Sequence, residues 1–290
     1  MNAVVVLNKP KGLTSHSASF KVKKLLNVKK AGHAGTLDPM ATGILLVCLD
    51  EGTKIAPFLM ELEKEYLFKA RFGISTDTYD AEGKTVKVVE NFQLDRETLL
   101  KTIEKFKGEI LQIPPMYSAV KVKGEALHRL ARKGIEIERK PKKVYISSIE
   151  IEDFQYPFAT FRVRCGKGTY VRSLCHDIGE HLGMGAHVVE LSRTKIGEFS
   201  IDMAVNFDTL KDIERAKEKL ISIDRALYFI PSITLQESLV QRFLNGNPVK
   251  IQSGIVPAGW VKVKNREGKI LGIGFGNGVT IKPERIIWEN

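Results

Sequence analysis

The sequence predicts an α+β protein with a small β-rich module at its C-terminal end. Residues 65–72 alternate in polarity, as a half-buried strand does, whereas residues 95–107 repeat apolar side chains at helical spacing. Towards the end of the chain, glycines separate short apolar segments, which is typical of a compact β module. We therefore expect a unit of mixed elements over residues 1–230 and a second unit over residues 231–290.

The composition indicates a globular protein with an anionic partner. The chain has 290 residues, of which 43% are hydrophobic and 27% are charged, and its formal net charge is +11. Such an excess favours nucleic acid, a membrane surface or a phosphorylated ligand. No apolar run approaches the ~20 residues of a membrane-spanning helix. Three cysteines without C-x-x-C spacing argue against a disulfide framework and a zinc site, so we expect a reduced, cytoplasmic protein.

The first elements should be a strand and a helix. Residues 2–8 are rich in valine and end in a basic turn, where Lys9 suits a phosphate contact and a solvated turn equally well. Thr14 or Ser15 can cap the helix that follows, which we expect to direct Phe20 toward the core.

An irregular loop at residues 32–43 has the sequence GHAGTLDPMATG. Its three glycines and one proline predict unusual backbone, and the apolar strand 44–49 follows directly. Asp38 is the first acidic residue and stands behind seven lysines, so nearby cations should favour its charged form. Because an Asp-Pro pair is also common turn chemistry, the pattern alone leaves a turn cap and a reactive carboxylate equally open.

The strand over residues 65–72 leads into an acidic loop. Tyr66 lies on the apolar face of this strand, so its simplest interpretation is a core aromatic residue. Asp77, Asp80 and Glu82 in the loop lack the remaining positions of a calcium loop, and we reject a metal site there.

A strongly basic segment covers residues 121–143. It holds nine Lys or Arg, among them Arg132, Lys133 and Lys142, against three Glu, a net of +6. Most charge runs are solvated faces, but this one follows the aromatic Tyr117. We interpret it as an arm laid on phosphates.

Two more helices are expected in the second half of the 1–230 unit. The segment GKGTYVR at residues 166–172 opens the first, and backbone amides at a helix start attract anions. Arg172 opposes the helix dipole there, so we expect it to have a partner elsewhere. Residues 206–230 also look helical, with Asp208 as the cap. Two strands, at residues 143–151 and 158–165, precede them and should pair as a hairpin or lie as neighbours.

In these segments the chain resembles the TruB-type pseudouridine synthases, over roughly residues 1–230. The matching segments are NKPKG at 8–12, GHAGTLDPMATG at 32–43, GKGTYVR at 166–172, GMGAHV at 183–188 and LSRT at 191–194. The segment GEALHRLARKG at 124–134 resembles the RNA-gripping insertion of bacterial members, at about residues 120–145. The remainder, residues 231–290, is similar to the small PUA module that such enzymes often carry.

The resemblance implies a fold and an activity. The fold is a mixed, mainly antiparallel sheet with flanking helices and a cleft across it. The activity is conversion of uridine 55 in the T arm of tRNA to pseudouridine, without metal or organic cofactor. The expected partner is the T-arm stem-loop of tRNA, with no membrane, no obligate protein partner and a monomeric state.

The resemblance also implies residue roles. Asp38 corresponds to the catalytic aspartate, Arg172 to the arginine that pairs with it, and Tyr66 to the tyrosine that stacks on the extruded base, which replaces its core interpretation. Further positions for substrate or RNA binding are His33, Tyr170, Leu191, Lys9, Arg132, Lys133 and Lys142.

Two alternatives remain open. An RNA-binding protein without catalysis could use Gly32 to Gly35 as a G-x-x-G backbone clamp, although this leaves Asp38 and Arg172 unexplained. A glycosidase or base-removing enzyme normally needs a pair of carboxylates, and no second acid stands out in the sequence near Asp38.

Overall fold

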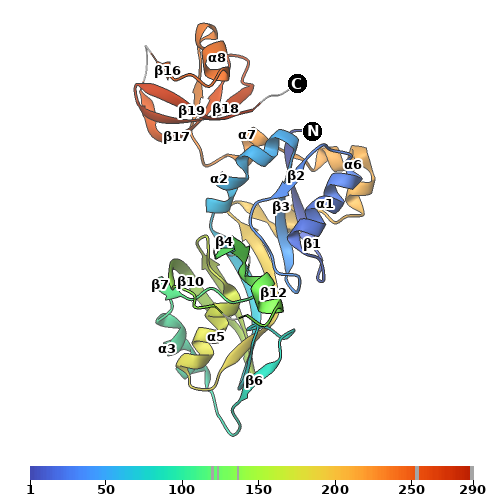
Figure 1. The fold of residues 1–290 in the computed structure, drawn as a ribbon, viewed down its shortest axis with the longest axis vertical. Coiled ribbons are helices and arrows are strands. Elements are labelled where there is room, and N and C mark those ends of the chain that lie inside the picture. Colours follow the sequence, from blue (N-terminus) through green and yellow to red (C-terminus); the bar gives the residue numbers. More distant parts are fainter. Residues whose placement is uncertain (119–120, 123, 136, 252–254, 288–290) are drawn as a thin grey trace.

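The chain is organised around one large sheet and one small sheet (Figure 1). The structure, a computed structural model, describes residues 1–118, 121–122, 124–135, 137–251 and 255–287. The large sheet has the order β14-β1-β3-β12-β4-β11-β10-β7. Its strands are β1 (Ala3–Lys9), β3 (Thr42–Leu49), β4 (Lys64–Phe72), β7 (Gly108–Gln112), β10 (Lys142–Gln155), β11 (Phe158–Cys165), β12 (Ala186–Ile196) and β14 (Ile221–Ser222).

A short parallel contact joins two antiparallel halves of this sheet. Along the described path, β3 and β12 pair in parallel at Ser192 with Thr42 and at Arg193 with Gly43, and the other neighbours are antiparallel. Gly43 has φ +95, and a Cβ there would overlap the backbone of Arg193. Glycine is therefore required for the two halves to meet. The observed mixed, mainly antiparallel sheet confirms the predicted fold class.

Helices cover both halves of the large sheet (Figure 1). α5 (Val171–His181) and α3 (Arg96–Glu104) bury their apolar faces against β4 and the β10–β12 region. In the other half, alternate residues of β1 and β3 face two separate cores, because helices pack on both sides. One side is covered by α1 (Ser15–Leu25) and α6 (Ile213–Glu218), and the other by α2 (Ala56–Glu61) and α7 (Ile223–Ala226).

The C-terminal residues form a second sheet with a core of its own. Its order is β15-β17-β18-β19-β16, and α8 (Glu237–Leu244) packs on it. The strands are β15 (Ser232–Thr234), β16 (Val249–Lys250), β17 (Val256–Lys264), β18 (Ile270–Gly278) and β19 (Thr280–Ile286). Trp260 of β17 meets Phe58 of α2 edge to face, with ring centroids 5.1 Å apart, so the small sheet packs against the large unit.

The remaining elements are short. They are β2 (Ala31–His33), β5 (Ile74–Thr76), β6 (Thr85–Val88), β8 (Lys121–Val122), β9 (Glu125–Ala126), α4 (Leu127–Arg132), β13 (Phe199–Ser200) and the 3₁₀ turns Asp50–Ile55, Ile201–Met203 and Thr209–Lys211. Within the residues placed by the structure, none of the helices has the length and apolar character to span a membrane.

The hairpin is confirmed, but three local predictions are wrong. β10 and β11 pair antiparallel, as expected. Phe20 is 48% exposed, because α1 buries the small residues Ser15, Ala18 and Ser19 together with Val22 instead. Residues 206–230 do not form one helix, since β14 pairs with the edge of β1 in their middle.

The cap in that region was also predicted wrongly. Asp212, rather than Asp208, accepts the amide protons at the start of α6.

Candidate active site

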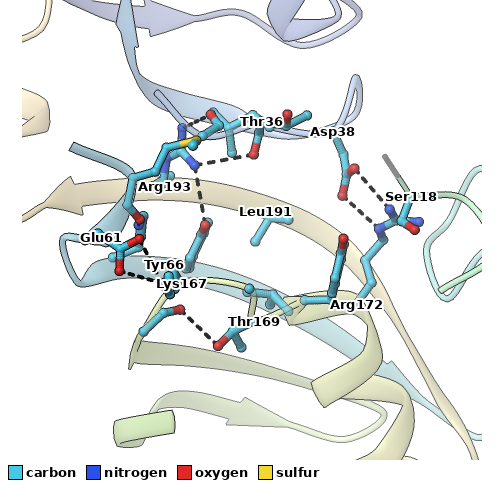
Figure 2. A pocket seen from close by; sticks show the side chains of 18 of the residues that line it. Thr36, Asp38, Glu61, Tyr66, Ser118, Lys167, Thr169, Arg172, Leu191 and Arg193 are labelled. Atoms are coloured by element: carbon cyan, nitrogen blue, oxygen red, sulfur yellow. Dashed lines mark hydrogen bonds and ion pairs between the residues drawn. The ribbon is translucent and has the colours of Figure 1, made fainter. Parts of the chain in front are cut away.

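An open cavity of about 520 Å³ lies where the two halves of the large sheet meet (Figure 2). The loop before β3, the strands β4 and β12, and the start of α5 contribute its walls. The lining includes five of the residues singled out from the sequence, namely Asp38, Tyr66, Tyr170, Arg172 and Leu191, together with Arg193. Side chains that are far apart in the chain are thus brought to one site.

Asp38 and Arg172 form a two-point ion pair at one end of the cavity (Figure 2). Arg172 Nε donates to Asp38 Oδ2 at 2.8 Å, and Nη2 donates to Oδ1 at 3.0 Å. The Arg172 side chain is 3% exposed, whereas that of Asp38 is 30% exposed. The buried guanidinium therefore binds both oxygens of Asp38, while part of the carboxylate remains exposed at the cavity.

The other donors of Arg172 are also occupied. Nη2 donates to the carbonyl of Tyr117 at 2.8 Å, and Nη1 donates to the carbonyl of Thr78 at 2.9 Å. Nη1 also lies 3.3 Å from Oδ2 of the buried Asp80. Sequence reasoning considered Asp80 only as a metal ligand and missed this ion pair. The sequence carries a partial signal, since an arginine that opposes its helix dipole implies a partner elsewhere, but nothing local identifies that partner as an acid or shows that there are two.

The helix α1 supports the loop that carries Asp38. Ser15, at the start of α1, is 2% exposed; its hydroxyl accepts from Leu37 N at 2.7 Å and donates to Leu37 O at 3.0 Å. On the other side of Asp38, the carbonyl of Pro39 accepts from Gly12 N at 2.8 Å. The residues before and after the acid are therefore both fixed by the N-terminal segment.

Arg193 organises the opposite end of the cavity, although it enters the sequence analysis only within the LSRT segment and has no role there. It is 1% exposed. Its guanidinium donates to the carbonyls of Ile44 at 2.8 Å, Gly35 at 3.1 Å and Thr36 at 3.4 Å, and to the Tyr66 hydroxyl at 3.5 Å. Tyr66 is 9% exposed, and burial raises the pKa of its phenol. This network fixes both the loop and the tyrosine.

Lys9 does not offer the phosphate contact that we predicted, nor is it a solvated turn residue. Its side chain is fully buried, and Nζ donates to the carbonyls of Pro10 at 2.9 Å, Leu13 at 2.8 Å and Pro39 at 3.4 Å. Burial lowers the pKa of Lys9 to about 8. The structure therefore makes Lys9 a support of the Asp38 loop.

Of the other RNA-binding candidates, Tyr170 lines the cavity, whereas His33, Lys133 and Lys142 are not among its lining residues. Tyr170 is fixed through its backbone, which exchanges two hydrogen bonds with the buried Gln112, at 2.7 and 3.0 Å. His33 lies on β2 and is half-buried; burial, aided by Arg193, lowers its pKa. Lys133 is exposed and pairs with Glu125 at 2.7 Å, and Lys142 is exposed at the start of β10. Arg132 ends α4, but its side chain lies outside the described part of the chain.

The arrangement is that of an enzyme site. A partly exposed carboxylate, oriented by a buried guanidinium and facing an open cavity with an aromatic wall, suits acid–base or nucleophilic chemistry on a planar substrate. The alternative of a pair of reacting carboxylates is not favoured, because Asp80 lies behind Arg172 and is 5% exposed.

Comparisons of sequence identify the family. A sequence model described as TruB family pseudouridylate synthase (N terminal domain) matches residues 23–171. Models described as tRNA pseudouridylate synthase B C-terminal domain and Pseudouridine synthase II TruB, C-terminal match residues 172–230 and 231–287. The chain belongs to the TruB family of pseudouridylate synthases, as its motifs predicted.

Curated relatives match nearly the whole chain. The tRNA pseudouridine synthase B of Clostridium tetani is 45% identical over 276 residues, which cover 94% of this chain and 95% of that protein. The protein of the same name from Pseudomonas aeruginosa is 39% identical over 294 residues, covering 99% of this chain and 96% of its own.

The fold is shared with solved structures of larger assemblies. A chain in the crystal structure of a Cbf5-Nop10-Gar1 complex is 26% identical and superimposes with a TM-score of 0.76, covering 99% of this chain and 85% of that one. A chain in the structure of an H/ACA RNP bound to a substrate RNA containing 2′-deoxyuridine shows the same fold. It is 23% identical, with a TM-score of 0.75, and the match covers 99% of this chain and 85% of that one.

Proposed function

We propose that this chain converts uridine 55 in the T arm of tRNA to pseudouridine, with Asp38 as the catalytic residue. The family and the names of its relatives support isomerisation of uridine in tRNA. One observation carries the assignment of Asp38. Its carboxylate is 30% exposed to the cavity, while the guanidinium that orients it is 3% exposed. The acid thus turns its open side toward an entering nucleoside.

The reaction needs a charged acid and no redox partner. The N1–C1′ bond breaks, the uracil turns, C5 joins C1′, and the proton lost from C5 is balanced by one gained at N1. Neither a metal nor an organic cofactor is required for this exchange. Since C1′ gains positive character as the bond breaks, an ionised Asp38 can attack that carbon, add to the uracil ring or remove the C2′ proton.

Tyr66 and Leu191 are the proposed walls for the extruded base. A uridine in folded RNA must leave its stack to reach the acid, which costs a few kcal/mol. Stacking on an aromatic ring returns about 1–3 kcal/mol per base, so Tyr66 can offset much of that cost. The cavity of about 520 Å³ lies in the usual range of roughly 300–1,000 Å³ for small-molecule sites.

The remaining predicted residues extend the interface along the RNA. We assign His33 to the RNA backbone near the target, Tyr170 to the aromatic wall beside Arg172, and the arm around Lys133 and Lys142 to phosphates. Residues 1–230 then form the catalytic domain and residues 231–290 a PUA-like RNA-binding domain. The protein acts as a monomer in the cytoplasm, where tRNA is available without a protein partner.

Mapping the modified position tests the proposal. Unmodified tRNA transcripts are incubated with the purified protein and sequenced for pseudouridine, and we expect conversion at position 55 alone. The matched control is Asp38→Asn, which keeps the side-chain volume and should bind tRNA within about threefold while losing at least about 10⁴-fold in turnover. Measurable turnover by Asp38→Asn refutes the role of Asp38.

The same reactions separate the rival functions. Binding without any pseudouridine would support the non-catalytic RNA-binding protein. Release of free uracil would instead support a base-removing enzyme.

A further inference from the structure

Tyr79 adopts a backbone conformation that its side chain does not favour. Its φ is +64, in the left-handed region where glycine and asparagine are the usual residues. Tyr79 stands between Thr78 and Asp80, which both contact the guanidinium of Arg172. A strained residue at such a place is a reason to ask what holds it there and what the arrangement does.

An aromatic stack holds the Tyr79 side chain against α5. Its ring lies on the imidazole of His176, with centroids 3.9 Å apart and an angle of 10° between the planes. His176 follows Arg172 by four residues on α5, so both side chains project from the same face of the helix, one turn apart. The stack therefore ties the loop to the helix next to Arg172.

The backbone of the loop is held from the opposite side by β12. The carbonyl of Tyr79 accepts from Val188 N at 3.0 Å, and Ala81 N donates to Val188 O at 2.9 Å. Within the loop, the Thr78 hydroxyl donates to Asp80 Oδ1 at 2.6 Å. The loop is thus fixed between a strand and a helix, with the Tyr79 ring as its only aromatic contact to the helix among the described residues.

This position of the loop determines where Arg172 can lie. Nη1 of Arg172 donates to the Thr78 carbonyl at 2.9 Å and is 3.3 Å from Asp80 Oδ2. With that end of the guanidinium fixed, Nε and Nη2 are directed at the two oxygens of Asp38. A shift of the loop would rotate the guanidinium and, with it, the carboxylate.

We propose that Tyr79 and His176 form a clamp that sets the orientation of Arg172 toward Asp38. They are positioning residues: they act through Thr78 and Asp80 on Arg172 and need not touch the RNA. This inference rests on the proposed function and deepens it, because it names two residues that keep Arg172 oriented toward Asp38.

The test compares Tyr79→Asn with Tyr79→Phe in single-turnover assays on tRNA. Asparagine tolerates the left-handed backbone but removes the ring, so the fold is kept and the clamp is lost. We expect the saturating single-turnover rate constant to fall about tenfold for Tyr79→Asn, with the half-saturating enzyme concentration within about twofold, because small misplacements of catalytic groups cost rate rather than binding. Tyr79→Phe keeps the stack and should retain the wild-type rate.

A double-mutant cycle with Asp80→Asn shows whether the effect passes through Arg172. If it does, Tyr79→Asn should lower the single-turnover rate by less than about twofold when Asp80→Asn is already present, because the contact through which it acts has been weakened. His176→Ala removes the same stack from the helix side and should reproduce the loss, without adding to that of Tyr79→Asn. The clamp would be overturned if the rate losses of Tyr79→Asn and Asp80→Asn multiplied fully in the double variant. It would also be overturned by a wild-type rate for Tyr79→Asn, or by a Tyr79→Phe enzyme as slow as Tyr79→Asn. An inactive wild-type protein would instead overturn the proposed function.

Discussion

The two buried arginines of the cavity are held in opposite ways. Arg172 is 3% exposed, and its guanidinium meets two carboxylates, those of Asp38 and Asp80. Arg193 is 1% exposed, and its donors reach three backbone carbonyls and one hydroxyl. Over the part of the chain that the structure describes, no carboxylate lies within ion-pair distance of Arg193.

This difference separates two tasks. At the Arg172 end, opposite charges balance, and the arginine orients an acid. Arg193 has no carboxylate partner among the described residues, and two further buried cations, Lys64 and the Lys9 that supports the Asp38 loop, are likewise held by carbonyl groups. Burial, with a contribution from Arg193, lowers the pKa of both lysines to about 8. We propose that Arg193 holds the backbone of the cavity, whereas Arg172 supports chemistry by orienting Asp38.

Among the variants that compare the two arginines, the largest effect on rate is expected from Arg172→Lys. An ammonium keeps the charge but cannot bridge both oxygens of Asp38 while reaching Thr78 and Asp80. We expect the single-turnover rate to fall about 10²-fold, with tRNA affinity within about threefold. Thermal unfolding of the same samples is the control for misfolding. A rate within threefold of the wild type would contradict the orienting role.

Arg193→Lys should instead lower the stability of the protein and leave the rate of the folded enzyme nearly unchanged. Carbonyls of Gly35, Thr36 and Ile44 would lose their donors, and a buried unsatisfied group costs about 1–3 kcal/mol. We expect the free energy of unfolding to fall by about 2–4 kcal/mol, while the folded fraction keeps its rate within about threefold. Lys195→Gln, an exposed change on the same strand, is the matched control. A loss of rate without a loss of stability would show that Arg193 acts in the chemistry.

The buried lysines predict how stability depends on pH. Because the pKa of Lys9 and Lys64 is about 8 in the folded state, against 10.5 ordinarily, the unfolded chain binds more protons above pH 8. Stability should therefore rise between about pH 8 and 9, by about 1 kcal/mol per lysine. Above about pH 9 the trend reverses, because burial also raises the pKa of the three buried thiols of Cys48, Cys165 and Cys175, and unfolding then releases their protons.

Urea titrations at several pH values measure this slope. Lys9→Met should remove about half of the rise. An unchanged slope in Lys9→Met would mean that Lys9 is not the buried cation responsible.

The smallest effect is expected from the basic arm. Neutralising Arg132, Lys133 and Lys142 together should weaken tRNA binding and reduce the slope of log K against log salt by about 1–2, since Lys133 already pairs with Glu125. Lys217→Gln in α6 serves as the control for a general loss of charge. Equal salt slopes for the triple variant and the wild type would exclude the arm as a phosphate contact.

The sequence predicted the acidic end of the cavity better than the basic end. Asp38 and Arg172 were recognisable because each contradicted its surroundings, one as the first acid after many lysines and the other as a cation at a helix start. Arg193 and Lys9 gave no such signal. Their partners are backbone carbonyls, which every residue carries, so no pattern of side chains reveals them.

The errors in the fold have a related cause. The segment 206–230 has helical spacing, but Ile221 and Ser222 pair with the edge of β1, and this long-range pairing overrides local preference. Phe20 has the apolar character of a core residue, yet α1 turns another face inward: Ser15 bonds to Leu37 of the Asp38 loop, and Ala18 packs in the core on β1 and β3. Proximity in space, which the sequence does not encode locally, decided both cases.

The two-residue contact between β3 and β12 has a consequence for how the enzyme is made. It joins Thr42 and Gly43 to residues that leave the ribosome some 150 positions later. Arg172 emerges shortly before that late segment and Arg193 within it, so the loop with its aspartate has both of its arginine partners only after the segment has emerged. A nascent chain can therefore build most of its first half early, but it gains the power to modify RNA only near the end of its synthesis.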